Sequence, residues 1–231
     1  MKYKIEWRET VGFLGFFLIF ATLYFSLIYT GPAKFFTAPN AQKLFFFHVP
    51  SGLVTYLAFL MVVGGSAFYL YNQSYYADRI AKCSAELGIV FGFMSLASGT
   101  LWMKAEWGGD IFSRFLTDMR LATTLAMWLL YIAYLVYRRQ PETSIVKSNA
   151  AVFGMSGLIM VPLSYLSSRF LRSHHPVIVG TAEQDSLDPS LRIGLYMGIL
   201  AFTLLYFFLL NIRMQIEELD KIIFSRKMGD L

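Results

Sequence analysis

The chain has 231 residues, of which 56% are hydrophobic and only 15% charged, and its mean hydropathy is +0.52. Soluble globular proteins carry roughly 25% charged residues, so this composition excludes a water-soluble domain. The net charge of +5 is compatible with nucleic-acid binding, but the Lys and Arg residues lie between apolar segments, where positive charge orients membrane proteins. We therefore expect membrane lipid, and no nucleic acid, among the partners.

Six apolar windows follow one another along the chain, each about as long as the 20 residues that a helix needs to cross the hydrocarbon core. They predict an all-α integral membrane protein, a single polytopic domain over residues 1–231 with six transmembrane helices. The predicted spans are residues 11–29, 51–71, 83–103, 121–137, 150–166 and 193–212. The basic leader MKYKIEWR precedes an apolar stretch longer than the usual signal-peptide core, so we expect the first span to be retained.

The positive charges predict the orientation of these spans. The N-terminus, residues 72–82, residues 138–148 and the C-terminal tail hold three, two, three and four Lys and Arg, twelve in all, whereas the other three loops hold eight. Cytoplasmic loops carry the excess of positive charge. We therefore expect both termini in the cytoplasm, and the longer loops 31–50, 104–120 and 168–192 on the outer, periplasmic face. Long loops tend to carry function.

All three histidines, His48, His174 and His175, lie in these outer loops. Two imidazoles from separate segments can supply both axial ligands of a haem iron, whereas zinc normally takes three or four ligands. The other interpretation is that each His hydrogen-bonds at the membrane interface. For the pair His48 and His175 the sequence alone leaves both interpretations open.

Aromatic and cationic residues accompany the histidines. The aromatic ones are Trp102, Trp107, Phe112 and Phe115, and the cations are Lys104, Arg114, Arg120, Arg169, Arg172 and Arg192. Aromatic faces can cover a porphyrin, and cations can bind its two propionates. Taken singly, these residues equally fit an interfacial aromatic belt and a solvated loop.

Several segments resemble one known family. FFFHVPSG, SAELGIVFGF, SGTLWMKAEWG, DMRLATTLAMWLLYIAYLVYR and VPLSYLSSRFLRSHHP resemble, in this order, segments of the haem-handling membrane proteins of cytochrome c maturation, the CcmC family and its CcsA relatives. The resemblance covers roughly residues 40 to 215.

The resemblance implies a haem holder of the bacterial cytoplasmic (inner) membrane, not an enzyme. It implies non-covalent haem b with bis-His axial ligation by His48 and His175, the second being the His directly before the proline. Trp102 and Trp107 match the opening of the family's tryptophan-rich loop, and Asp118 and Arg120 match its D-x-R-L ending.

The resemblance also implies partners and one departure. The partners are a periplasmic haem chaperone that accepts the haem, ABC-type transporter subunits and a small single-span subunit. The loop itself departs from the family's pattern, because no Trp follows Trp107 and the sequence continues GGDIFSRFLTD. We expect Phe112 and Phe115 to supply stacking faces there.

Two functions of other classes compete with haem handling. One is a b-type cytochrome membrane subunit in quinone-linked electron transfer, which usually places its His within the spans, whereas none of the predicted spans contains a His. The other is a solute transporter, for which intramembrane charges would mark a pathway. Glu86 is the only charge within the predicted spans.

Overall fold

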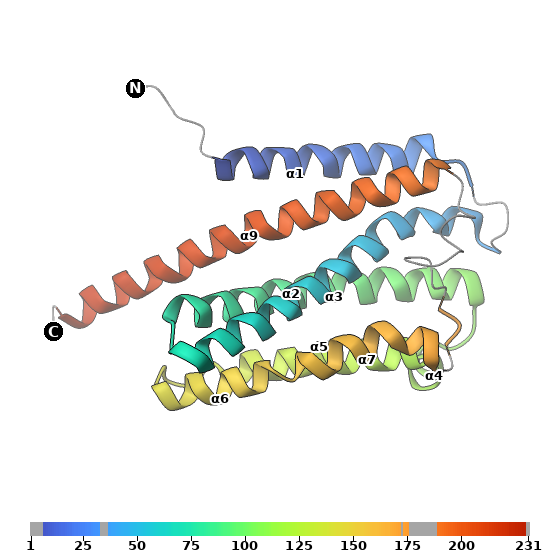
Figure 1. Ribbon diagram of the computed structural model, residues 1–231. Coiled ribbons are helices and arrows are strands. Elements are labelled where there is room, and N and C mark those ends of the chain that lie inside the picture. Colours follow the sequence, from blue (N-terminus) through green and yellow to red (C-terminus); the bar gives the residue numbers. More distant parts are fainter. Residues whose placement is uncertain (1–6, 33–36, 172, 176–188, 230–231) are drawn as a thin grey trace, which may run out of the picture.

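The computed structural model describes residues 7–32, 37–171, 173–175 and 189–229, and the regular structure of these residues is helical. Figure 1 shows the helices in chain order. Their bounds are α1 Trp7–Tyr24, η1 Phe25–Tyr29, η2 Pro39–Leu44, α2 Phe45–Asn72, α3 Tyr75–Trp107, α4 Ile111–Thr117, α5 Met119–Tyr137, α6 Ser144–Gly154, α7 Gly157–Phe170 and α9 Pro189–Gly229.

The described residues contain six helical segments that are long and apolar enough to cross a bilayer. The expectation of an all-α, multi-pass membrane protein is thereby confirmed. The six segments are Glu9–Tyr29, Pro39–Asn72, Tyr75–Trp107, Met119–Tyr137, Ser144–Phe170 and Pro189–Arg226.

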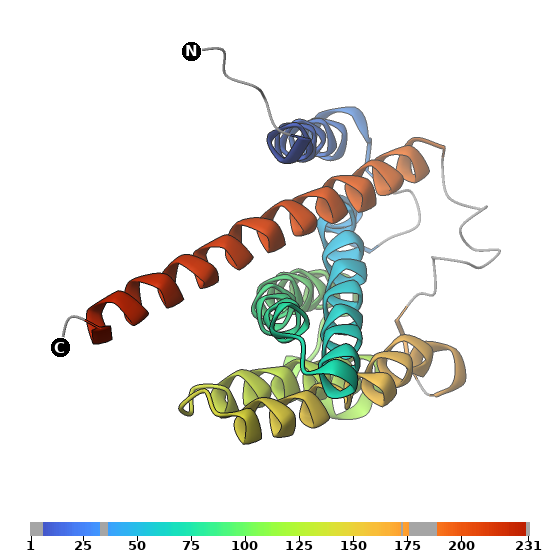
Figure 2. The ribbon, with the colours of Figure 1, turned by 60° about the vertical axis from the view of Figure 1, so that its left-hand side comes forward.

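Helix α2 lies at the centre of the bundle and packs against α3, α9, α6 and α7, while α1 packs against α9. The start of α1 and the end of α9 lie at one end of the molecule, together with the α2–α3 and α5–α6 connections (Figure 1). We call this the terminal end, and the opposite end, where α2 begins and α3 ends, the histidine end. Figure 2 shows α9 crossing the bundle at an angle, with α1 on its outer side.

Small residues bring α2 and α3 close together. A Cβ at Gly88 of α3 would lie 2.5 Å from Phe59 of α2, and one at Gly65 of α2 would lie 2.7 Å from the Ala77 carbonyl oxygen of α3. Because such distances are too short for real contacts, only glycine fits at these two positions. Close packing through small residues is the usual way in which helices associate in a bilayer.

The second helix begins earlier than expected. The predicted span began at residue 51, but α2 begins at Phe45, so His48 lies in its first turn and not in a loop. Pro50 cannot donate a hydrogen bond to the Phe46 carbonyl. That carbonyl and the Pro50 ring face Gly198 of α9, where a Cβ would lie 3.1 Å from the oxygen and 3.0 Å from the ring. The proline is therefore accommodated within the helix by close packing against α9.

The fifth span is broken, although it was predicted as one helix. It consists of α6 and α7, and a turn at Met155 and Ser156 separates them. A side chain at Gly154 would collide with Ser66, and one at Gly157 with the Tyr131 hydroxyl. Glycine and serine together are a common cause of such breaks.

At the terminal end, α9 continues as one helix beyond the predicted sixth span, as far as Gly229. Ion pairs hold it against the rest of the bundle, Lys82–Glu217 at 2.5 Å and Lys221–Glu142 at 2.9 Å among them. Partial burial of Glu142 opposes its ionisation, but the hydrogen bond from Lys221 and the charge of Lys147 prevail and lower its pKa to about 2.

Candidate functional site

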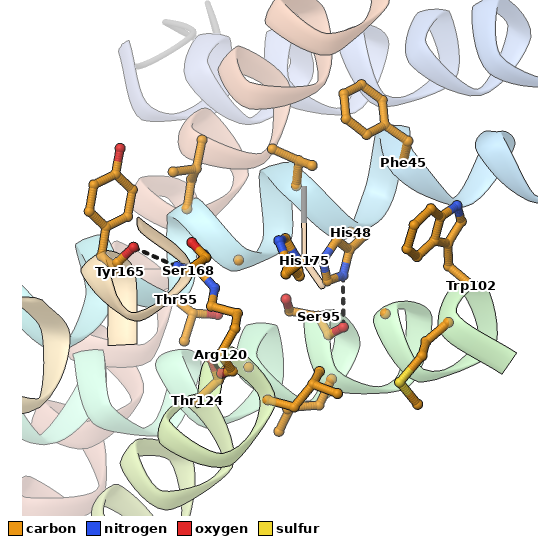
Figure 3. Close-up of a pocket in the computed structure, with 18 of the residues that line it drawn as sticks. Phe45, His48, Thr55, Ser95, Trp102, Arg120, Thr124, Tyr165, Ser168 and His175 are labelled. Atoms are coloured by element: carbon orange, nitrogen blue, oxygen red, sulfur yellow. Dashed lines mark hydrogen bonds between the residues drawn. The ribbon is translucent and has the colours of Figure 1, made fainter. Parts of the chain in front are cut away.

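A pocket opens at the histidine end between α2, α3, α5 and α7, and both His48 and His175 line it (Figure 3). The lining residues are Gln42, Phe45, His48, Val49, Gly52, Leu53, Thr55, Tyr56, Gly92, Ser95, Leu96, Gly99, Trp102, Met103, Trp107, Arg120, Leu121, Thr124, Met127, Tyr165, Ser168, Arg169, His175 and Leu191. Most of these side chains are apolar or aromatic, which is usual for the site of a small molecule or cofactor.

The two imidazoles point toward each other from distant parts of the chain. Their Nε2 atoms are 3.5 Å apart, and their ring centroids are 5.8 Å apart. Metal–imidazole bonds are about 2.0 Å long, so two ligands on opposite sides of one metal stand about 4 Å apart. A small outward movement of one ring would therefore let both nitrogens bind a single iron.

Helix α3 fixes the orientation of the His48 ring. The Nδ1 atom lies 3.0 Å from the Ser95 carbonyl oxygen, which can accept a hydrogen bond but cannot donate one. Nδ1 therefore carries the hydrogen, and Nε2 keeps its lone pair directed into the pocket. Histidines that bind metals usually donate their second N–H to a carbonyl or a carboxylate in this way.

Gly99 makes the room that this ring needs. A Cβ at position 99 would lie 2.6 Å from Cε1 and 2.9 Å from Nδ1 of His48. We expect Gly99→Ala to displace the imidazole and weaken ligand binding about tenfold, the lower end of the range for changes behind a metal ligand. Gly64→Ala on α2 is the matched control, since a Cβ there meets nothing within 4 Å. Titration of both variants with haem checks this, and equal affinities would contradict the role of Gly99.

Asp118 holds the segment that carries His175. Its carboxylate is only 2% exposed and accepts hydrogen bonds from the Ser173 hydroxyl at 2.9 Å and the His174 backbone N–H at 2.7 Å. The Ser173 hydroxyl in turn accepts a hydrogen bond from the His175 N–H at 3.0 Å. The same carboxylate caps the first turn of α5 through the Arg120 N–H at 2.9 Å. Asp118 thus ties His175 to the start of α5.

Arg120 forms part of the pocket wall between α5 and α7. It donates hydrogen bonds of 2.8 Å to the backbone carbonyls of Ser164 and Tyr165, and its guanidinium lies over the rings of Tyr56 and Tyr165. The guanidinium of Arg169 also lies over the Tyr165 ring, 4.9 Å from its centroid. Two cations therefore border an otherwise mostly apolar pocket, an arrangement that suits an anionic ligand with an apolar body.

Trp102 and Trp107 lie together near the end of α3 and both line the pocket. Their rings meet edge to face with centroids 5.1 Å apart. The loop that was predicted from residue 104 begins later, because α3 continues to Trp107 and α4 occupies much of the segment between α3 and α5. Trp107 also faces His174, whose ring centroid lies 5.9 Å away.

Other predicted residues lie elsewhere. Phe112 and Phe115 belong to α4 and do not line the pocket, and Phe112 is 72% exposed. Asp118 does not line the pocket either, and it supports His175 indirectly through the hydrogen bond from the Ser173 hydroxyl. His174 is 75% exposed and does not line the pocket, and its Nδ1 lies 3.9 Å from the Asp118 carboxylate. Arg172 lies outside the described residues.

Four residues of the site, Ser95, Gly99, Tyr56 and Tyr165, were not singled out from the sequence. Ser95 and Gly99 are one helical turn apart, and this small-xxx-small spacing is the signal of a close helix approach. Nothing in the sequence shows that the approaching group is an imidazole. Among the residues that the structure describes, no three His, Cys, Asp or Glu side chains come together as a possible metal site.

Comparison with known proteins gives a consistent result. A family model described as "CcmC: Heme exporter protein C" matches residues 2–228. A "Heme exporter protein C" of Bradyrhizobium diazoefficiens is 30% identical over 188 residues, which are 80% of this chain and 70% of the relative. Proteins of the same name from Escherichia coli and Paracoccus denitrificans are 24% and 26% identical, each over 76% of this chain and over 70% and 72% of the relative.

Proposed function

The chain belongs to the haem exporter protein C family, and from this premise we propose that it binds haem b non-covalently between His48 and His175 and passes it to an acceptor. The family takes part in haem handling for cytochrome c maturation, and its members are transfer components, not enzymes. The observation that carries the proposal is the 3.5 Å separation of the two Nε2 atoms inside one pocket.

The surrounding side chains suit the rest of the ligand. The rings of Trp102 and Trp107 would cover porphyrin surface, while Arg120 and Arg169 would form charge-assisted hydrogen bonds with propionates. All four residues line the same pocket as the His pair. Haem would therefore be recognised by its iron, its apolar plane and its carboxylates at once.

The two ligands differ in how they are held, which supports a mechanism of release. His48 is part of helix α2 and its ring is held by Ser95, whereas His175 lies outside the helices and its segment is held by the Asp118 and Ser173 side chains. We propose that His175 is the exchangeable ligand. An acceptor that supplies its own ligand would replace His175 while His48 retains the iron.

The orientation and the partners belong to the same proposal. The charge distribution favours cytoplasmic termini, which would put the histidine end on the outer face of the inner membrane. The acceptor there would be a periplasmic haem chaperone. The name shared by the relatives, an exporter protein, supports assembly with ABC-type transporter subunits, and the family resemblance adds a small single-span subunit.

The competing cytochrome function gains no specific support. The expectation that no His lies within a span was wrong, because His48 is in the first turn of α2. The chain nevertheless has only three His, and all of them lie at the histidine end. They leave no second His pair for another haem at the terminal end.

The test is purification of the full chain from cells that make haem. We expect about one haem b per chain, measured by the pyridine haemochrome, and its transfer to an added haem-free acceptor with an accessible His. Purified protein that neither contains haem nor takes it up from solution would contradict the proposal.

A further inference from the structure

A second groove lies beside the histidine pocket, between α2 and α7. Its rim is formed by Leu60, Pro162 and Leu166, which are exposed on the surface of the bundle. These residues belong to the apolar part of two candidate membrane spans. In a bilayer the groove therefore faces lipid and not water.

Only a thin wall separates this groove from the histidine pocket. Leu53 of α2 lines both cavities, and so do Tyr56 of α2 and Tyr165 of α7. The two tyrosine rings meet edge to face with centroids 6.0 Å apart, and the Tyr56 hydroxyl hydrogen-bonds to Ser164 of α7 at 3.0 Å. Two aromatic rings and one hydrogen bond thus join α2 and α7 at the boundary between the cavities.

The charges at this wall suit one kind of molecule. The Arg120 guanidinium lies 5.6 Å from the Tyr56 ring centroid and 5.9 Å from that of Tyr165, on the side of the histidine pocket. Beyond the two rings, toward lipid, the rim is aliphatic. These surfaces are complementary to a flat apolar molecule that carries anionic groups. Its apolar plane would contact the aliphatic groove, and its carboxylates would pair with Arg120.

Helix α7 begins at a break in the fifth span. The turn at Met155 and Ser156 separates it from α6 and would serve as the hinge for a tilt of α7 away from α2. Pro162 lies inside α7 at the rim, where it removes one backbone hydrogen bond. A modest tilt of α7 away from α2 would part the two tyrosine rings.

We propose that the groove is a lateral portal through which haem enters the pocket from the lipid, with Tyr56 and Tyr165 as its gate. This inference rests on the proposed function and adds a route to it. Haem dissolved among acyl chains would pass the aliphatic rim first, then the parted rings, and would come to rest where Arg120 meets a propionate and the imidazoles meet the iron.

The experiment measures haem uptake by the full chain in nanodiscs from phosphatidylcholine vesicles that contain haem. Leu60→Trp and Leu166→Trp each narrow the rim, and we expect uptake to be about tenfold slower with an unchanged final spectrum. Leu163→Trp is the matched control, because Leu163 lies on the same helix, is 42% exposed and lines neither cavity. Uptake by the rim variants at the rate of the control would overturn the portal.

A second variant tests the gate in the opposite direction. Tyr56→Phe keeps the ring but removes the hydrogen bond to Ser164. Losing the net stabilisation of one hydrogen bond from the closed gate should speed haem uptake about fivefold. If the tryptophan variants fail to fold, an unchanged rate for Tyr56→Phe overturns the proposal by itself. Failure of the wild type to bind any haem would instead contradict the proposed function.

Discussion

Replacement of either His48 or His175 by alanine is expected to lower the affinity for haem by at least about 100-fold. Changes behind a metal ligand already cost 10- to 100-fold, and here a ligand itself is removed. Each ring lines the pocket, and the two Nε2 atoms face each other at 3.5 Å. Titration with haem, followed by its absorption spectrum, measures the effect.

The adjacent histidine provides the control. His174→Ala changes the same residue type one position away, but the side chain of His174 is 75% exposed and lies outside the pocket lining. Its affinity for haem should stay within about twofold of the wild-type value, a range typical of changes at the surface. A loss in His174→Ala equal to that in His175→Ala would show that the wrong member of the pair has been assigned.

Asp118→Asn is expected to weaken haem binding by 10- to 100-fold, the range found for residues that orient a metal ligand. One carboxylate oxygen accepts from the Arg120 N–H and the other from the His174 N–H, and the Ser173 hydroxyl lies close to both. An amide replaces one of these acceptors by a donor. Either the cap of α5 or the segment that carries His175 must therefore lose its partner.

Asp110→Asn is the matched control for this effect. Asp110 also caps a helix, accepting a hydrogen bond of 2.6 Å from the Ser113 N–H at the start of α4, but it does not line the pocket. Haem affinity and thermal stability should both be measured. If Asp118→Asn binds haem as tightly as Asp110→Asn does, then Asp118 does not position His175.

The sequence predicted the class of fold because that prediction depends only on composition along the chain. Six long apolar windows predict a polytopic helical protein, because every backbone N–H and C=O group in the bilayer needs a hydrogen-bond partner and a helix supplies it within one segment. Helix ends were harder to predict. The second span was predicted from residue 51, yet α2 begins at Phe45, because packing against Gly198 accommodates Pro50 within the helix.

The site could be predicted in part. His48 and His175 were singled out by residue type and resemblance, and the structure brings them into one pocket. Aromatic character alone placed Phe112 and Phe115 in the same group, but α4 carries Phe112 on an exposed face. A residue type shows which chemistry is available, whereas only tertiary packing decides which side chains share a cavity.

The roles of the residues that support the ligands could not be predicted from the sequence. Asp118 was singled out because it matches the family's D-x-R-L ending, but its part in holding His175 depends on contacts across 55 positions of the chain. Gly99 reads as a small residue of an apolar helix, although its missing side chain is what admits the His48 ring. Both effects arise from the approach of distant segments.

The electron paramagnetic resonance spectrum of the ferric, haem-loaded protein tests the central claim most directly. If His48 and His175 both bind the same iron, the wild type will give a low-spin signal of the bis-imidazole type. Removal of His175 will convert it to a high-spin signal that returns to low spin when free imidazole is added. A wild-type spectrum that is high-spin, or a low-spin spectrum that survives the loss of His175, would contradict the shared ligation of one iron.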